Sequence, residues 1–261
     1  QTKSQIETQD EQNRFSNYVS HRELFNETFE KEKLFSGTSS FKARPSLLHS
    51  SLYPDLLKTG SIKSQIPNKK VFDSDVWSSF NLFLEEASEI NYRMTDYTWE
   101  ATDALQSFAN ELAACFHLQY AQDKTPGEDI EQLLTEGERL AKGIHDLHVS
   151  MSLLDESEAE GVVFDMLFKL ENALARVQAS HREAKKLKNI AKLIEDSAIN
   201  DEKILPAELS LIQKELSGNK AKIKLEYMFS SLFKTEMGKK KLIEVAPSEA
   251  IPEHLPKRIK Q

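Results

Sequence analysis

The chain has 261 residues, with 34 Lys and Arg against 42 Asp and Glu, so its formal net charge is −8. This length suffices for one large domain or two small ones, and a single cysteine excludes an intrachain disulfide framework. No stretch approaches the ~18 apolar residues that cross a bilayer, and the acidic balance argues against binding nucleic acid over the whole surface.

Leucine dominates the apolar residues, with 31 Leu against only 8 Val, and the chain holds only 8 Gly and 8 Pro. Leucine keeps most of its rotamers in a helix, whereas valine does not. Neither Gly nor Pro occurs in 68–125 or in 162–205, and both residues are excluded from helix interiors. The sequence therefore predicts an all-α fold with long helices.

The N-terminal third predicts shorter elements. Phe15, Val19, Leu24, Phe25 and Phe29 are spaced as in an amphipathic helix, and the leucines of 47–57 indicate a second, shorter one. Residues 59–70 are polar and indicate a linker. We therefore expect a domain boundary near residue 70.

The first long helix is expected to begin at Asp73 or Ser74 and to run to about Tyr120. Its apolar residues advance in alternating steps of three and four from Trp77 to Cys115, and Leu105 and Phe108 lie on this face. Asn91 and Thr98 are the polar exceptions, which indicates a kink or a register-fixing contact near them.

Two more long helices should follow, one from Thr125-Pro126 to about residue 154 and one from Ser157 to about residue 200. Short turns between them force antiparallel packing. Short helices are then expected from Leu205-Pro206 to Gly218 and from Asn219 to Gly238. The predicted fold is an elongated antiparallel bundle of three long helices with short C-terminal helices and extended terminal arms. Its segments are 1–70 (arm, short helices and linker), 71–238 (bundle) and 239–261 (tail).

His145-Asp146 is the most metal-like pair in the sequence, with His148 one turn further on. An upstream His, an adjacent His-Asp pair and a later Asp resemble the HD family of metal phosphohydrolases. The resemblance implies that His117, His145, Asp146 and either Asp165 or Asp196 would be the metal ligands. The motif is two residues long, and long heptad helices differ from that compact fold. An enzyme is therefore our third choice, and we predict no cofactor, no metal site and no catalytic residue.

Charge and the tail suggest interaction instead. Residues 127–160 hold ten acids and two bases, whereas 169–192 hold seven bases and two acids. Such opposite charges either attract the adjacent antiparallel helices to each other or dock charged partners. The tail pattern of Glu244, Glu249 and Glu253 followed by Ile259 resembles the C-terminal signals read by bacterial type IV secretion machines. That resemblance implies a translocated bacterial effector, which is our second choice.

We expect foremost a non-enzymatic, cytoplasmic adaptor or scaffold subunit of a multiprotein assembly, such as an accessory subunit of a bacterial secretion machine. A membrane-curving helical dimer ranks fourth. The partners are other proteins and not nucleic acid, while peripheral membrane contact and homo-oligomerisation stay open. The bundle would supply stability, and apolar residues of the terminal arms would bind the partner: Phe15, Leu24, Phe25, Phe29, Leu242, Ile243 and Val245.

Overall fold

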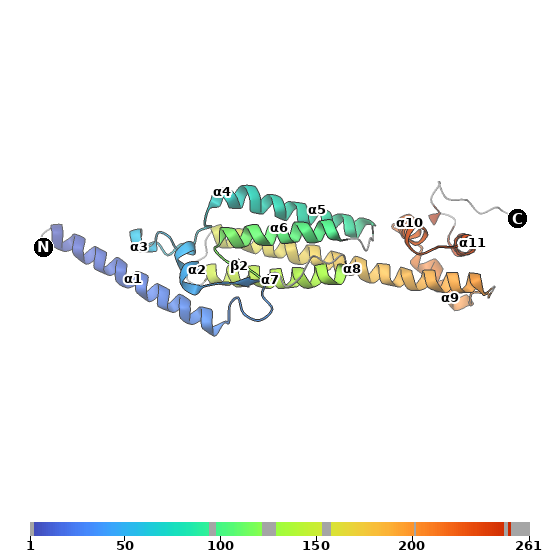
Figure 1. Ribbon diagram of the computed structural model, residues 1–261, viewed down its shortest axis with the longest axis horizontal. Coiled ribbons are helices and arrows are strands. Elements are labelled where there is room, and N and C mark those ends of the chain that lie inside the picture. Colours follow the sequence, from blue (N-terminus) through green and yellow to red (C-terminus); the bar gives the residue numbers. More distant parts are fainter. Residues whose placement is uncertain are drawn as a thin grey trace. The chain divides into compact units, whose positions relative to one another are not determined.

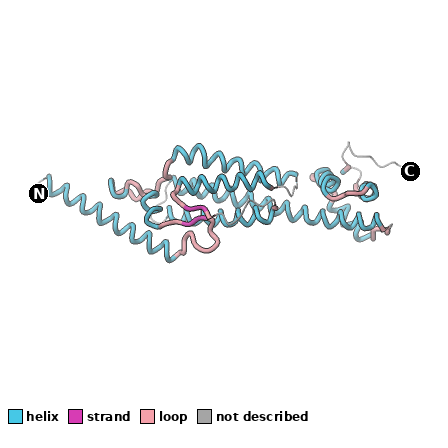
Figure 2. Tube along the Cα trace, in the orientation of Figure 1, coloured by secondary structure: helices cyan, strands magenta, loops and turns pink. Residues whose placement is uncertain are grey.

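The computed structural model describes residues 3–93, 98–121, 129–152, 158–200, 202–247 and 250–251. Over these residues the chain is mostly helical, with a single pair of two-residue strands, which confirms the predicted all-α class (Figure 2). Contacts divide it into unit 1, residues 1–88 and 98–175, and unit 2, residues 89–97 and 176–261. The predicted division into segments 1–70, 71–238 and 239–261 is a statement about which parts fold independently, so it remains a prediction.

Unit 1 holds the N-terminal elements and most of the bundle (Figure 1). In chain order these are α1 (Lys3–Lys31), β1 (Phe41–Lys42), α2 (Pro45–Leu52), α3 (Leu56–Thr59), α4 (Lys69–Val71), the π-helical turn η1 (Phe72–Val76), most of α5 (Trp77–Arg93), α6 (Trp99–Cys115), β2 (Gln119–Tyr120), α7 (Ile130–Ser152) and residues 158–175 of α8 (Glu158–Ile199).

Helices α5 and α6 of unit 1 run antiparallel. The rings of Phe80 on α5 and Phe108 on α6 are 4.8 Å apart between centroids, and those of Phe72 and Phe116 are 6.0 Å apart. Sequence numbers therefore rise along α5 as they fall along α6. Phe80, Leu105 and Phe108 are all buried, which confirms the predicted core face.

The expectation of one helix from residue 73 to about 120 is wrong. Helix α5 ends at Arg93, α6 begins at Trp99, and Thr98 occupies the N-cap position of α6. A continuous helix would carry Phe108 roughly 40 Å away from Phe80 at ~1.5 Å per residue. The antiparallel return instead lets both rings bury each other fully, and this gain in apolar burial favours two helices over one.

A two-residue antiparallel sheet, which the sequence analysis did not predict, pairs Phe41 with Tyr120 and Lys42 with Gln119. The Ser40 N–H donates to the Arg139 carbonyl of α7 over 3.1 Å. Phe41 is fully buried, and its ring packs so closely on Gly143 of α7 that a β-carbon there would clash with it. The segment after α1 is thus packed on the bundle of unit 1.

Unit 2 contains residues 176–199 of α8, then α9 (Pro206–Glu215), α10 (Ala221–Ser231) and α11 (Glu236–Val245). Their apolar faces share one core around Leu187, Ile194, Ile212, Leu225 and Leu242. At the edge of that core the Lys224 ammonium lies 2.7 Å from a Glu183 carboxylate oxygen and donates to the Glu215 carbonyl over 2.9 Å. This ion pair joins α10 to α8.

The expectation of an extended tail from residue 239 is wrong for 239–245, which belong to α11. Gly238, expected to stop a helix, instead lies in the first turn of α11, where its N–H donates to the Thr235 hydroxyl. A β-carbon at Gly238 would stand 2.5 Å from the Phe233 ring. Close packing therefore explains this glycine better than helix termination does.

Candidate functional site

Helix α1 is mostly exposed to solvent, above all along its first half. Among its 29 residues only His21 and Phe25 are buried, and residues 3–13 are exposed throughout. The inner stripe comprises Arg14, Tyr18, His21, Phe25 and Phe29, at steps of four, three, four and four. This stripe faces α2 and α3. In the two turns before Arg14, the same face of α1 carries only exposed acidic residues: Asp10 or Glu11, and Glu7.

A cluster of aromatic and histidine rings holds the second half of α1 on α2. The Nδ1 atom of His21 lies 2.9 Å from the Nε2 atom of His49 on α2, and both side chains are buried. Ring contacts with Tyr18, Phe25 and Tyr53 surround this pair. We name these five residues the α1 cluster; together with the contacts between α1 and α3, it docks α1.

Tyr53 links the α1 cluster to the bundle. Its hydroxyl donates toward the carbonyl oxygens of Ser150 and Met151 on α7, at 3.0 and 3.3 Å. Burial raises the pKa of Tyr53 far above its usual value, and the charge of Glu160 adds to this rise. The hydroxyl therefore stays protonated and keeps its donor.

A buried carboxylate fixes the loop that follows α1. One Asp146 oxygen accepts the N–H of Phe35 over 2.8 Å, and the other lies 2.5 Å from the Lys142 ammonium. Lys33 and Phe35 both have positive φ, at 51° and 55°, a conformation that costs a non-glycine residue free energy. Asp146 thus holds a strained loop on α7.

The structure does not bring the suggested HD-type ligands together. His117 and His145 are exposed, Asp146 is engaged as above, and no group of three or more His, Cys, Asp or Glu among the described residues could hold a metal ion. His148 lies 3.1 Å from Glu160, so its nearest carboxylate belongs to α8. All five suggested ligands lie within the described ranges.

The predicted partner-binding residues separate into two groups. Phe15 and Leu24 are 61% and 44% exposed, whereas Phe29 is half-buried and stacks on Phe35. Phe15 and Leu24 are nine residues apart, so they lie on opposite flanks of the inner stripe. We call the exposed surface of α1 outside that stripe its outer face. Phe25 is buried in the α1 cluster. The prediction is corrected for Phe25 and for three residues buried in the core of unit 2, which a partner cannot reach without local unfolding: Leu242, Ile243 and Val245.

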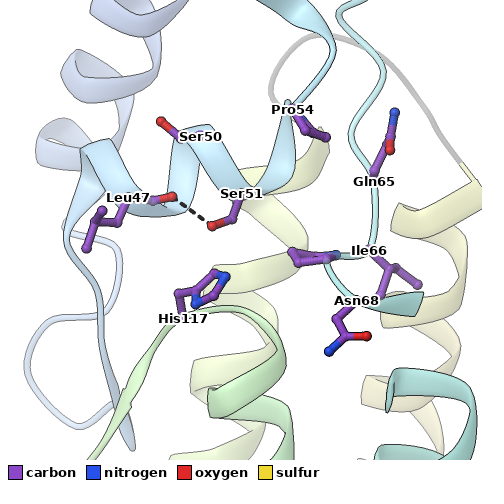
Figure 3. A pocket seen from close by; sticks show the side chains of 9 residues that line it. Leu47, Ser50, Ser51, Pro54, Gln65, Ile66, Asn68 and His117 are labelled. Carbon is purple, nitrogen blue, oxygen red and sulfur yellow. Dashed lines mark hydrogen bonds between the residues drawn. The ribbon is translucent and has the colours of Figure 1, made fainter. Parts of the chain in front are cut away.

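A surface pocket of about 520 Å³ lies between α2 and the segment that precedes α4 (Figure 3). Its lining includes Leu47, Ser51, Ile66 and His117 and carries no formally charged side chain. The Ser51 hydroxyl donates to the Leu47 carbonyl within α2, which leaves its oxygen able to accept. Chemically, this pocket suits a small uncharged ligand.

Cys115 lies beside that pocket without lining it. The thiol donates to the Pro67 carbonyl over 2.8 Å, and burial raises its pKa to about 11. A protonated, buried thiol is a poor nucleophile. The prediction that Cys115 belongs to the apolar core is confirmed.

The sequence analysis missed the α1 cluster. His21 lies one turn before Phe25, and His49 follows Leu48, so both sit within apolar patterns where a polar residue is unusual. This is the one signal that could have indicated buried histidines. Their pairing joins positions 28 residues apart and cannot be seen in either pattern alone.

Comparison with known proteins adds no relative, because no protein-family model, curated protein or solved structure matches the chain. Each helix among the described residues is too short or too polar to cross a bilayer. The tail pattern behind the effector hypothesis lies largely outside the described residues, at Glu249, Glu253 and Ile259, so that hypothesis stays a prediction.

Proposed function

We propose that the protein is a non-enzymatic adaptor that presents the outer face of α1 to a partner protein of a larger assembly. The observation that carries this proposal is the sparse burial of α1, with two buried residues in 29. In proteins, most helix stability comes from packing an apolar face. A long helix with so little packing of its own is suited to gain more from a partner.

Two exposed side chains on α1 are suited to anchor such a partner. Phe15 is 61% exposed and Leu24 is 44% exposed, and they flank the inner stripe on opposite sides. Large apolar side chains at the centre of an interface supply a disproportionate share of binding free energy. Phe15 and Leu24 are therefore the residues that we assign to partner binding.

The charge of the two units supports an adaptor as well. Residues assigned to unit 1 include 15 Lys and Arg against 28 Asp and Glu, whereas those of unit 2 include 19 against 14. Opposite potentials steer partners and fix their orientation. An accessory subunit of a bacterial secretion machine is one form of such an adaptor, and the lone thiol fits a cytoplasmic location.

The test is quantitative capture by the full-length, C-terminally tagged chain from a lysate of the source organism at pH 7.5, read out by mass spectrometry. The variant is Phe15→Ala with Leu24→Ala. The matched control is Leu57→Ala with Leu211→Ala, because these leucines are 49% and 52% exposed on α3 and α9. Circular dichroism verifies that all chains keep the same helical content.

We expect the α1 variant to lose at least about tenfold in recovery of the proteins that the wild type enriches, since each anchor is worth more than ~1 kcal/mol. The control should retain them. Equal recovery by the α1 variant would refute the assignment of α1. Equal loss in the control would show non-specific adhesion to exposed leucine.

A further inference from the structure

The His21–His49 pair has an unusual hydrogen-bonding state. Two neutral imidazoles share one hydrogen bond, in which one ring donates and the other accepts. The outer nitrogens, Nε2 of His21 and Nδ1 of His49, are buried without a hydrogen-bond partner among the described residues. Whichever tautomers are present, one buried N–H and one buried lone pair therefore stay unsatisfied.

The surroundings of the pair oppose a positive charge. Tyr18 and Arg22 come from α1, and Tyr53 follows α2. Glu160 of α8 acts on Tyr53, and its carboxylate lies against His148 of α7. The charges that act on His49 come from His21 and Arg22, and both disfavour protonation. A second proton would place two cations with facing nitrogens 2.9 Å apart.

The two sides of the cluster are attached unequally. Tyr53 is bonded to α7 by its own hydroxyl, so the α2 side stays fixed without α1. Outside the α1 cluster, two further contacts hold α1. The Arg14 side chain donates to the Lys58 carbonyl over 2.7 Å, and the Phe29 ring stacks on Phe35. If the cluster fails, α1 is the part that moves.

We propose that the His21–His49 pair makes the docking of α1 on α2 dependent on pH, and that α1 detaches as the two rings become protonated. The inner stripe of α1 then turns to solvent beside the outer face. Acidification thereby changes the surface offered to a partner; this consequence rests on the proposed function, whereas the detachment itself does not.

The pKa shifts of His21 and His49 give the direction of the pH dependence and the pH range over which docking weakens. Burial lowers the pKa of His21, and burial together with the charges of His21 and Arg22 lowers the pKa of His49 from 6.5 to about 4. In the detached state His49 regains the ordinary value. Docking is therefore fully favoured above pH 6.5 and weakens as the pH falls toward 4. For His49 alone, the docking constant drops about 30-fold between pH 7.5 and 5.0.

Hydrogen exchange of the isolated full-length chain tests the proposal, with rates corrected for the intrinsic effect of pH on amide exchange. Peptides that cover residues 14–31 report α1, and peptides of α6 serve as the internal reference. The wild type should lose about 30-fold in protection of 14–31 between pH 7.5 and 5.0. Protection of α6 should change much less.

Two variants assign the effect. His21→Phe with His49→Leu removes both titratable rings but keeps apolar packing, and should abolish the pH dependence. His145→Gln, at an exposed position on α7, should leave it intact. An unchanged wild type, or a double variant that keeps the dependence, would overturn the proposal.

Imidazole NMR on the wild type gives a second readout that needs no variant, should the double variant misfold. The rings of His21 and His49 should titrate below the ordinary value of 6.5 while α1 is docked. Titration of both rings near 6.5 would overturn the proposal. Loss of partner capture through Phe15 and Leu24 is measured at pH 7.5, so failure of that test and failure of this one are distinguishable.

Discussion

Gly143 on α7 offers a sharp test of how the β1 segment packs on the bundle. Alanine at an ordinary helix position stabilises by about 1 kcal/mol relative to glycine. Here a β-carbon would stand 2.5 Å from Cδ2 of the Phe41 ring and 3.1 Å from Cε2. Phe41 is fully buried and its backbone is paired with β2, so the ring cannot move aside freely.

The size of the effect follows from two opposing contributions. Overpacking of a filled core costs about 1–3 kcal/mol. Set against a propensity gain of about 1 kcal/mol, Gly143→Ala should lower the free energy of unfolding by up to about 2 kcal/mol. Gly161 on α8 is the matched control, because a β-carbon there meets no atom within 4 Å. Gly161→Ala should therefore stabilise, by about 0.5–1 kcal/mol.

Tryptophan fluorescence during urea unfolding is the appropriate assay, because both tryptophans of the chain, Trp77 and Trp99, belong to unit 1. Adding Phe41→Leu to Gly143→Ala should recover part of the loss, which a double-mutant cycle measures as coupling. If Gly143→Ala stabilised as much as Gly161→Ala, Phe41 would not lie against Gly143, and the placement of the β1 segment would be wrong.

Two further predictions concern burial. Leu242→Ala should destabilise unit 2 by about 2–5 kcal/mol, measured by thermal unfolding of the full chain. Leu211→Ala should change the stability little, because its side chain is half in solvent. Equal melting curves for the two variants would contradict a core role for α11. Cys115 should resist a thiol reagent at pH 8 in the native chain and react promptly in denaturant, because its thiol is buried with a pKa of about 11; rapid native labelling would show that the α6 end opens easily.

Local signals in the sequence were sufficient for most helices. Pro206 begins α9, Gly218 follows it, and α8 ends at Ile199, close to the expected position. These boundaries depend on the backbone properties of single residues, which act in any fold. The burial of Leu105 and Phe108 followed from periodicity in the same way.

Features that depend on contacts distant in sequence were not predictable. Apolar residues recur in steps of three and four both in one long helix and in two antiparallel helices that share a core. The apolar spacing across Asn91 and Thr98 therefore could not show that the chain turns back between α5 and α6. Leu242 and Ile243 look like isolated apolar residues until α9 and α10 surround them. The same holds for His21 and His49, whose buried environment comes from separate helices.

The central claim is that the outer face of α1 contacts a partner protein. Hydrogen exchange of the complex captured by the full-length chain at pH 7.5, compared with the chain alone, measures this directly. We predict that peptides covering residues 3–24 gain protection in the complex while those of the pocket-lining segment 65–68 do not. Unchanged exchange along α1 in a complex that remains intact would contradict the account.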